Sequence, residues 1–360
     1  MIKNFLKRFS HSHRENISSS TATHQICEGA YSEIASEEDI EACFRLLLGR
    51  KPLPKEWYGH KKEAGQKLIE IVSKFLSSHE FKSRKIFPPR LADSQHDIVE
   101  LDGFKLCLSR TDKICGPLLE TKEYEPHVTA ILKKVLAPGM VFLDIGANVG
   151  YFSCLAASIV GDNGCVLSFE PETYNIKLLN INTRLNGFKN VEIFPFAVSD
   201  RKGFFSYDDS TGNSGTICDV DMQVPAMLSS TLVYSMILDD VLESCTRKVD
   251  VIKIDIEGAE YMAFKGMKNR LATDRPVIVS EFSPPFLKNI SKKKAEDYLD
   301  LLLINDNYSL AVIAGENNMI NCERDMDMVI QYYNEAPGDH IDIIAYPKER
   351  SVWETEKILP

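Results

Sequence analysis

The chain has 360 residues, of which 44% are hydrophobic and 26% are charged, and its formal net charge is −10. These values are ordinary for a globular protein with one large and one smaller domain, and we expect no nucleic-acid partner. It contains no apolar run of about 18 residues, so no transmembrane segment is predicted. The nine cysteines are scattered without C-x-x-C pairs, which indicates reduced thiols and a cytoplasmic location.

The N-terminal quarter of the chain is predicted to be separate from the main domain. Residues 1–30 are expected to form a frayed or disordered tail, whose apolar face at residues 2–9 leaves a weak peripheral membrane contact open. Residues 31–90 are predicted to form a small helical domain, because a capping box at Ser36 and Asp39 precedes helically spaced apolar residues. The pair Pro88-Pro89 marks a linker.

From residue 91 onward the chain changes to strands and helices. Residues 91–139 are predicted to form a β-hairpin, turning at Asp102-Gly103, and a helix that leads into the core. In residues 140–347 strand and helix patterns alternate, which predicts an α/β fold with a doubly wound sheet covered by helices on both faces. Residues 204–236 interrupt the alternation and are expected to form an insertion near the substrate, and residues 348–360 a tail.

The most informative stretch is an apolar strand that turns sharply into a helix. The strand ends at Asp144, and the turn contains Gly146, Ala147, Asn148 and Gly150. Its glycines are four residues apart, unlike those of the G-x-G-x-x-G loop that binds a dinucleotide phosphate. An acid at the strand end repels phosphate but suits a cation such as the amino group of a methionine moiety. These residues are therefore predicted to bind a cofactor that carries positive charge.

A second acid, Glu170, follows the next predicted strand. A carboxylate at this place can accept hydrogen bonds from both ribose hydroxyls. The two acids, with no lysine suited to phosphate, favour S-adenosyl-L-methionine over NAD or ATP. A nicotinamide-dependent oxidoreductase is disfavoured by the glycine spacing.

Three further acids are candidates for catalysis. Asp255 ends the clearest buried strand, Glu257 lies in the turn after it, and Glu281 lies near the end of the following strand. Side chains at these ends gather at the ligand edge of a parallel sheet. They could act as a base or gather a hard divalent cation, although no metal ligand is predicted. Lys253, in the buried strand, is expected to pair with an acid.

Taken in order, these motifs resemble FkbM-type S-adenosylmethionine-dependent methyltransferases over roughly residues 98–347. The resemblance rests on residues 142–152, Phe169-Glu170-Pro171, Asn182 with Asn186, and residues 197–200, 238–240 and 252–260. Outside it, residues 44–50, which end in the R-L-L-L-G-R signature, resemble a helical module found beside bacterial glycosyltransferases and methyltransferases. Arg50 in that module is expected to form ion pairs with local acids rather than bind an anionic sugar or lipid.

The resemblance implies a class I methyltransferase core with a seven-stranded sheet, and transfer of a methyl group to a hydroxyl. The acceptor would be a sugar of a glycan, glycolipid or natural product. Asp144 and the glycine turn would line the methionine and ribose part of the cofactor and Glu170 would hold the ribose. Asp200 or its neighbours would approach the adenine. The alternative is a catalytically inactive binding module that is recruited to a glycan-assembly complex.

Overall fold

The computed structural model describes residues 34–81, except 49 and 79, and residues 96–350, except 113–115, 209–214, 219–230 and 305. Of the described residues, those of 34–81 form one unit and those of 96–350 form another. The tail predicted at residues 1–30 lies outside the described residues, as does most of the tail predicted at 348–360. Among the described residues, no helix has the length and apolar character needed to cross a bilayer.

The smaller unit is helical. It consists of α2 (Glu37–Leu47), α3 (Pro54–His60), the 3₁₀ turn η1 (Lys61–Glu63) and α4 (Leu68–Ser77). The predicted capping box starts α2, because the Ser36 hydroxyl accepts from the Asp39 N–H and the Asp39 carboxylate accepts from the Ser36 N–H. Arg50 forms ion pairs with Glu56 at 2.8 Å and Glu80 at 2.6 Å, which confirms its predicted partners.

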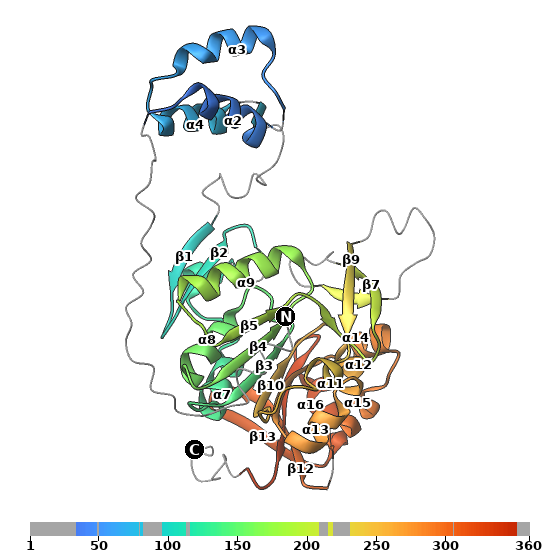
Figure 1. The fold of residues 1–360 in the computed structure, drawn as a ribbon. Helices are drawn as coiled ribbons and strands as arrows, with labels where there is room; N and C mark the ends of the chain where they lie inside the picture. The colour runs from blue at the N-terminus through green and yellow to red at the C-terminus, as the bar shows by residue number, and fades with distance from the viewer. Residues whose placement is uncertain are drawn as a thin grey trace. The chain divides into compact units, whose positions relative to one another are not determined.

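The larger unit is organised around an eight-stranded sheet with the order β13-β12-β14-β11-β10-β3-β4-β5 (Figure 1). Its strands are β3 (Val141–Ile145), β4 (Cys165–Phe169), β5 (Val191–Phe194), β10 (Val251–Ile254), β11 (Val277–Phe282), β12 (Tyr308–Gly315), β13 (Asn318–Glu323) and β14 (Ile341–Pro347). Strands β11, β10, β3, β4 and β5 are parallel, and β14 enters antiparallel between β11 and β12. This confirms the predicted fold class, with β13 added to the seven strands that the resemblance implies.

Two layers of helices cover the sheet. One face packs against α6 (Leu118–Thr121), α7 (Pro126–Val135), α8 (Tyr151–Val160), α9 (Thr173–Leu185) and the hairpin of β1 (His96–Glu100) and β2 (Lys105–Ser109). The other face packs against α11 (Leu238–Val241), α12 (Glu260–Lys265), α13 (Lys268–Asp274), α15 (Ala295–Leu302) and α16 (Met326–Glu335). Nearly all side chains of β3, β4 and β10 are therefore buried on both faces, as expected for a parallel sheet.

The insertion predicted at residues 204–236 supplies most of a second sheet. The strands of this sheet are β6 (Ala197–Val198), which precedes the insertion, and β7 (Gly203–Asp208), β8 (Thr216–Cys218) and β9 (Thr231–Met236), in the order β6-β9-β7-β8. A buried cluster that includes Phe205, Tyr207 and Ile217 packs it against Ala259 at the start of α12. Close by lie α14 (Pro284–Phe286) and the π-helical turn η3 (Leu287–Ser291), since α12 and β8 both contact η3. The insertion thus lies beside the carboxyl end of β10, where the site is built.

Candidate active site

The turn between β3 and α8 has the close backbone approach that its glycines predict. Gly146 has φ +85°, and a Cβ added there would lie 2.0 Å from the carbonyl oxygen of Asp255. Gly150 has φ +93°, and a Cβ there would lie 2.4 Å from Leu179. Glycine suits both positions. Because Gly146 has no side chain, the turn packs directly against the loop that carries Asp255.

A cavity of about 230 Å³ opens at this edge of the sheet. The glycine turn, the ends of β4, β10 and β11 and the insertion all contribute to its wall. Of the predicted site residues it is lined by Gly146, Ala147, Asn148, Glu170, Asp255, Glu257 and Glu281. The structure therefore gathers seven of the ten predicted residues around one cavity, as expected where the strand order reverses in a doubly wound sheet. Gly150, at the start of α8, is not part of its lining.

Glu170 is fixed in the wall of the cavity and is 4% exposed. One carboxylate oxygen accepts from the N–H of Asn148 at 2.8 Å, and the other accepts from the N–H of Glu172 at 2.9 Å. Burial raises the pKa of Glu170 to about 7, although these hydrogen bonds act in the opposite direction. The bond to Asn148 joins the predicted ribose acid to the glycine turn.

Asp144 requires a correction, because it does not line the cavity and is fully buried. Alternate side chains of β3 point to opposite faces of the sheet, and Asp144 points towards α8, where the Ser153 hydroxyl donates to it at 2.6 Å. Its neighbour in the parallel register is Lys253 on β10. Burial raises the pKa of Asp144, and the charge of Lys253 opposes that rise. Asp144 therefore does not contact the cavity directly, and its charge interacts with that of Lys253, which does line it.

Asp200 is the second correction. Its carboxylate lies 2.7 Å from the ammonium group of Lys265, and it does not line the cavity. The neighbours that precede it, Phe196, Ala197 and Val198, do line the cavity. The surface available to an adenine ring in this region is therefore apolar.

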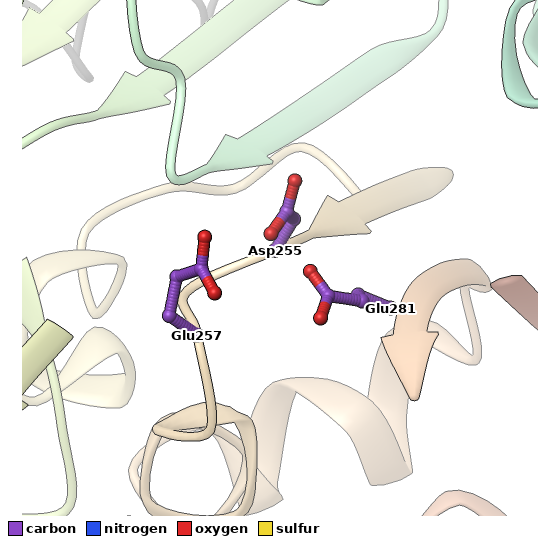
Figure 2. A group of neighbouring side chains, drawn as sticks. All are labelled: Asp255, Glu257 and Glu281. Carbon is purple, nitrogen blue, oxygen red and sulfur yellow. The ribbon is translucent and has the colours of Figure 1, made fainter. Parts of the chain in front are cut away.

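The three candidate catalytic acids converge in the cavity (Figure 2). Asp255 follows β10, Glu257 lies in the next turn with φ +55°, and Glu281 lies near the end of β11. One carboxylate oxygen from each lies within 4.8 Å of the others. The three acids were selected from their positions in the sequence, and the fold places them side by side.

Lys253 sets the charge of this cluster. Its ammonium group lies 2.9 Å from the Asp255 carboxylate and 4.8 Å from the centre of the Phe152 ring, and it lines the cavity. Burial alone would raise the pKa of Asp255, but Lys253 and a hydrogen bond with Glu281 lower it to about 2. Burial and the charge of Asp255 raise the pKa of Glu281. Within this pair Asp255 is the stronger acid, and Glu281 holds its proton more tightly.

Glu125 is a cavity residue that the sequence did not single out. It precedes α7 in the left-handed region, with φ +39°, and burial raises its pKa to about 7 against the opposing charge of Lys253. A non-glycine residue in this conformation is strained, a feature that clusters at functional sites. The only sequence signal was an acid directly before Pro126. His127 forms an ion pair with Asp342 at 2.6 Å and does not line the cavity.

Glu260 supports the turn that carries these acids. It begins α12, is 3% exposed, and accepts from the N–H groups of Ile256 at 3.0 Å and Gly258 at 3.2 Å. These hydrogen bonds support a structural role for Glu260 at the N-terminus of α12. Burial raises its pKa from 4.5 to about 7, with the charge of Asp255 acting in the same direction.

We expect Glu260→Gln to reduce the pH dependence of stability. A carboxyl group with a raised pKa stabilises the folded state fully below its ordinary value of 4.5, and that contribution is lost as the pH rises through about 7. Glutamine keeps the acceptor oxygen and cannot ionise, so the variant should lose less thermal stability than the wild type between pH 5 and pH 8. Thermal midpoints across this range measure the effect. An unchanged pH slope would contradict this assignment.

The part of the chain that holds most of this cavity is similar to known methyltransferases. Residues 144–310 match the family model for the methyltransferase FkbM domain. Hexuronic acid methyltransferase AglP from Haloferax volcanii is 26% identical over 174 residues, which are 48% of this chain and 68% of that protein.

Two solved structures have a related arrangement of elements. Methyltransferase FkbM from Methylobacillus flagellatus KT aligns with a TM-score of 0.37 and 15% identity over 59% of this chain and 48% of that one, so the match spans about half of its length. The O-methyltransferase from Bacillus cereus, in complex with SAH, aligns with a TM-score of 0.36 and 14% identity over 62% of this chain and 80% of that one. The match to the family model covers residues 144–310, which contain the glycine turn and all three acids.

Proposed function

We propose that this protein is an S-adenosyl-L-methionine-dependent O-methyltransferase that methylates a hydroxyl of a sugar in a glycan, glycolipid or natural product. The observation that carries the proposal is one cavity lined both by the glycine turn with Glu170 and by the acids Asp255, Glu257 and Glu281. The first group suits the methyl donor, and the second suits a hydroxyl acceptor. A cytoplasmic location is part of the proposal, supported by free cysteines throughout the described residues.

The residues of the cavity fit the donor. The buried Oδ1 of Asn148 has no hydrogen-bond partner among the described residues, and Asn148 lines the cavity. Such an orphaned acceptor suits a ligand N–H or O–H group. Glu170 would accept from the ribose hydroxyls, and Phe196, Ala197 and Val198 would cover the adenine. The bound donor supplies an electrophilic methyl group on a positively charged sulfur.

The acid cluster would bind and deprotonate the acceptor. Asp255 is held ionised and can accept a hydrogen bond from a sugar hydroxyl, which orients the oxygen for in-line attack. As the oxygen gains a bond to carbon its proton becomes strongly acidic, so even a carboxylate of low pKa is an adequate base. The hydrogen bond between Glu281 and Asp255 would fix the position of Asp255. Glu257, the third acid, would accept from a neighbouring hydroxyl of the same sugar.

A carbohydrate acceptor is supported by the relative that is a hexuronic acid methyltransferase, at 26% identity. The alternative of an inactive binding module is not favoured, because Asp255, Glu281 and the buried Lys253 lie together around the same cavity as the glycine turn. Incubation of the protein with isotope-labelled S-adenosyl-L-methionine and cell-envelope carbohydrate tests the proposal. Labelled sugar that is heavier by one CH₂ group supports it, and no transfer to any carbohydrate contradicts it.

We expect Glu170→Ala to weaken binding of S-adenosylhomocysteine by about 10- to 100-fold, because a charged hydrogen bond to the ribose contributes about 1.5–3 kcal/mol. Calorimetric titration measures this loss. The matched control is Glu172→Ala, which removes an acid two residues away that caps α9 and does not line the cavity. Equal affinity in Glu170→Ala and the wild type would remove Glu170 from the cofactor site.

A further inference from the structure

A second hollow, of about 490 Å³, adjoins the cavity. Ile217 on β8 lines both, so the two hollows share a wall. Strand β7, helix α12 and the turn around η3 form the remaining walls. We call this hollow the basic groove, because its charged lining residues are Arg201, Lys265, Lys292, Lys293 and Asp200.

The charge of the groove is opposite to that of the chain. Among the described lining residues, four cationic side chains face one acid, which gives these residues a formal charge of +3, whereas the whole chain carries −10. The one acid among them, Asp200, is paired with Lys265 at 2.7 Å. The ammonium group of Lys292 donates to a neutral group, the carbonyl oxygen of Asn289. The groove therefore presents excess positive charge in an acidic protein, which favours an anionic ligand.

Aromatic rings support two of these cations. The guanidinium carbon of Arg201 lies 4.7 Å from the centre of the Phe205 ring, and the Lys293 ammonium lies 5.0 Å from the centre of the Tyr261 ring. Cation–π contacts restrict the positions of long side chains that would otherwise move freely. The rings belong to β7 and α12, which also flank the acid-lined cavity. The positive charges are thus held at a defined place beside the proposed methylation site.

We propose that the basic groove binds an anionic part of the acceptor, a saccharide that carries a carboxylate or a phosphate, while the sugar to be methylated lies against Asp255. This inference rests on the proposed function and names its substrate class. Binding energy from a part of the substrate remote from the reacting oxygen can position that oxygen for reaction. The shared wall at Ile217 places the groove where a neighbouring sugar unit would lie.

Titration of the full chain with three probes tests this inference. The probes are trigalacturonate, which carries carboxylates, UDP-glucose, which carries a diphosphate, and the neutral trisaccharide maltotriose. We expect an anionic probe to bind and maltotriose to bind more weakly, and the stronger anionic probe identifies the source of the charge. In Lys292→Glu/Lys293→Glu, affinity for that probe should fall by at least about tenfold, because both contacts change from attraction to repulsion.

Lys288→Glu is the matched control, since Lys288 is exposed on the same η3 turn and does not line the groove. Lys292→Gln/Lys293→Gln provides a milder second variant, with an expected loss of intermediate size. Binding of S-adenosylhomocysteine should be unchanged in all variants, which shows that each is folded. The inference is overturned if neither anionic probe binds, if maltotriose binds equally well, or if Lys288→Glu weakens binding as much as the double variant. Failure of the wild type to bind S-adenosylhomocysteine would instead count against the proposed function.

Discussion

We expect Asp255→Asn to lower the rate of methyl transfer by about 10²- to 10⁴-fold, the usual contribution of a general base. Asparagine keeps the size of the side chain and an acceptor for Lys253, but it cannot take a proton from the acceptor hydroxyl. The affinity for S-adenosylhomocysteine should remain close to that of the wild type, because the proposed cofactor contacts lie in the glycine turn and at Glu170. Single-turnover rates and calorimetry measure the two quantities separately.

The matched control is Asp240→Asn, whose carboxylate forms an exposed ion pair with Lys202 at 2.7 Å away from the cavity. A rate in Asp255→Asn equal to that of the control would exclude Asp255 as the base.

A chelator distinguishes acid–base use of the cluster from metal binding. Since Lys253 already supplies a positive charge 2.9 Å from Asp255, we expect chelation to leave the rate unchanged. Loss of activity with EDTA and its return with Mg²⁺ would show that the three acids bind a metal.

The second large effect is expected for the buried lysine. Lys253→Met should destabilise the protein by about 3–5 kcal/mol, because removal of one partner leaves buried carboxylates without compensating charge. Asp144 is its neighbour in the strand register and Asp255 its ion-pair partner, and methionine keeps the apolar contact with Phe152. Chemical denaturation at neutral pH measures the loss. The loss should shrink in acid, where the carboxylates become protonated and need no partner.

Lys265→Met serves as the control for this prediction. Lys265 also pairs with an aspartate, Asp200, but its side chain is 39% exposed, so the pair contributes less than about 1 kcal/mol. If Lys253→Met were no more destabilising than Lys265→Met, the positive charge of Lys253 would not be needed to stabilise the buried carboxylates of Asp144 and Asp255. Because Lys253 is also expected to keep Asp255 ionised, the variant should lose activity even where it remains folded.

Much of the site could be predicted from the sequence, because strand ends and tight turns are determined by residues that are close together in the chain. The glycine spacing predicted a close backbone approach, and Gly146 indeed has no room for a side chain against Asp255. The acids Asp255, Glu257 and Glu281 were brought together by a general property of parallel sheets, whose carboxyl ends meet at one edge. Glu170 followed from the same property of β4.

The differences between prediction and structure arise from side-chain orientation and from contacts between residues that are distant in sequence. Asp144 lies in a strand buried on both faces, so its sequence gave no sign of which face it points to, and the structure turns it towards Ser153 and α8. The partner of Asp200 is Lys265, which is distant in sequence. Glu125 reaches the cavity from the element before the first strand of the fold, and only the tertiary arrangement brings it near Lys253. The edge strand β13 pairs with β12 and adds an eighth strand to the sheet.

A crystal structure of the protein with S-adenosylhomocysteine tests the central claim most directly. We expect the ribose of the ligand to contact Glu170 and its sulfur to lie on the side of Asp255. The adenine should lie beside Phe196, Ala197 and Val198. The ligand bound elsewhere, or bound with Glu170 and Asp255 both outside contact distance, would contradict it.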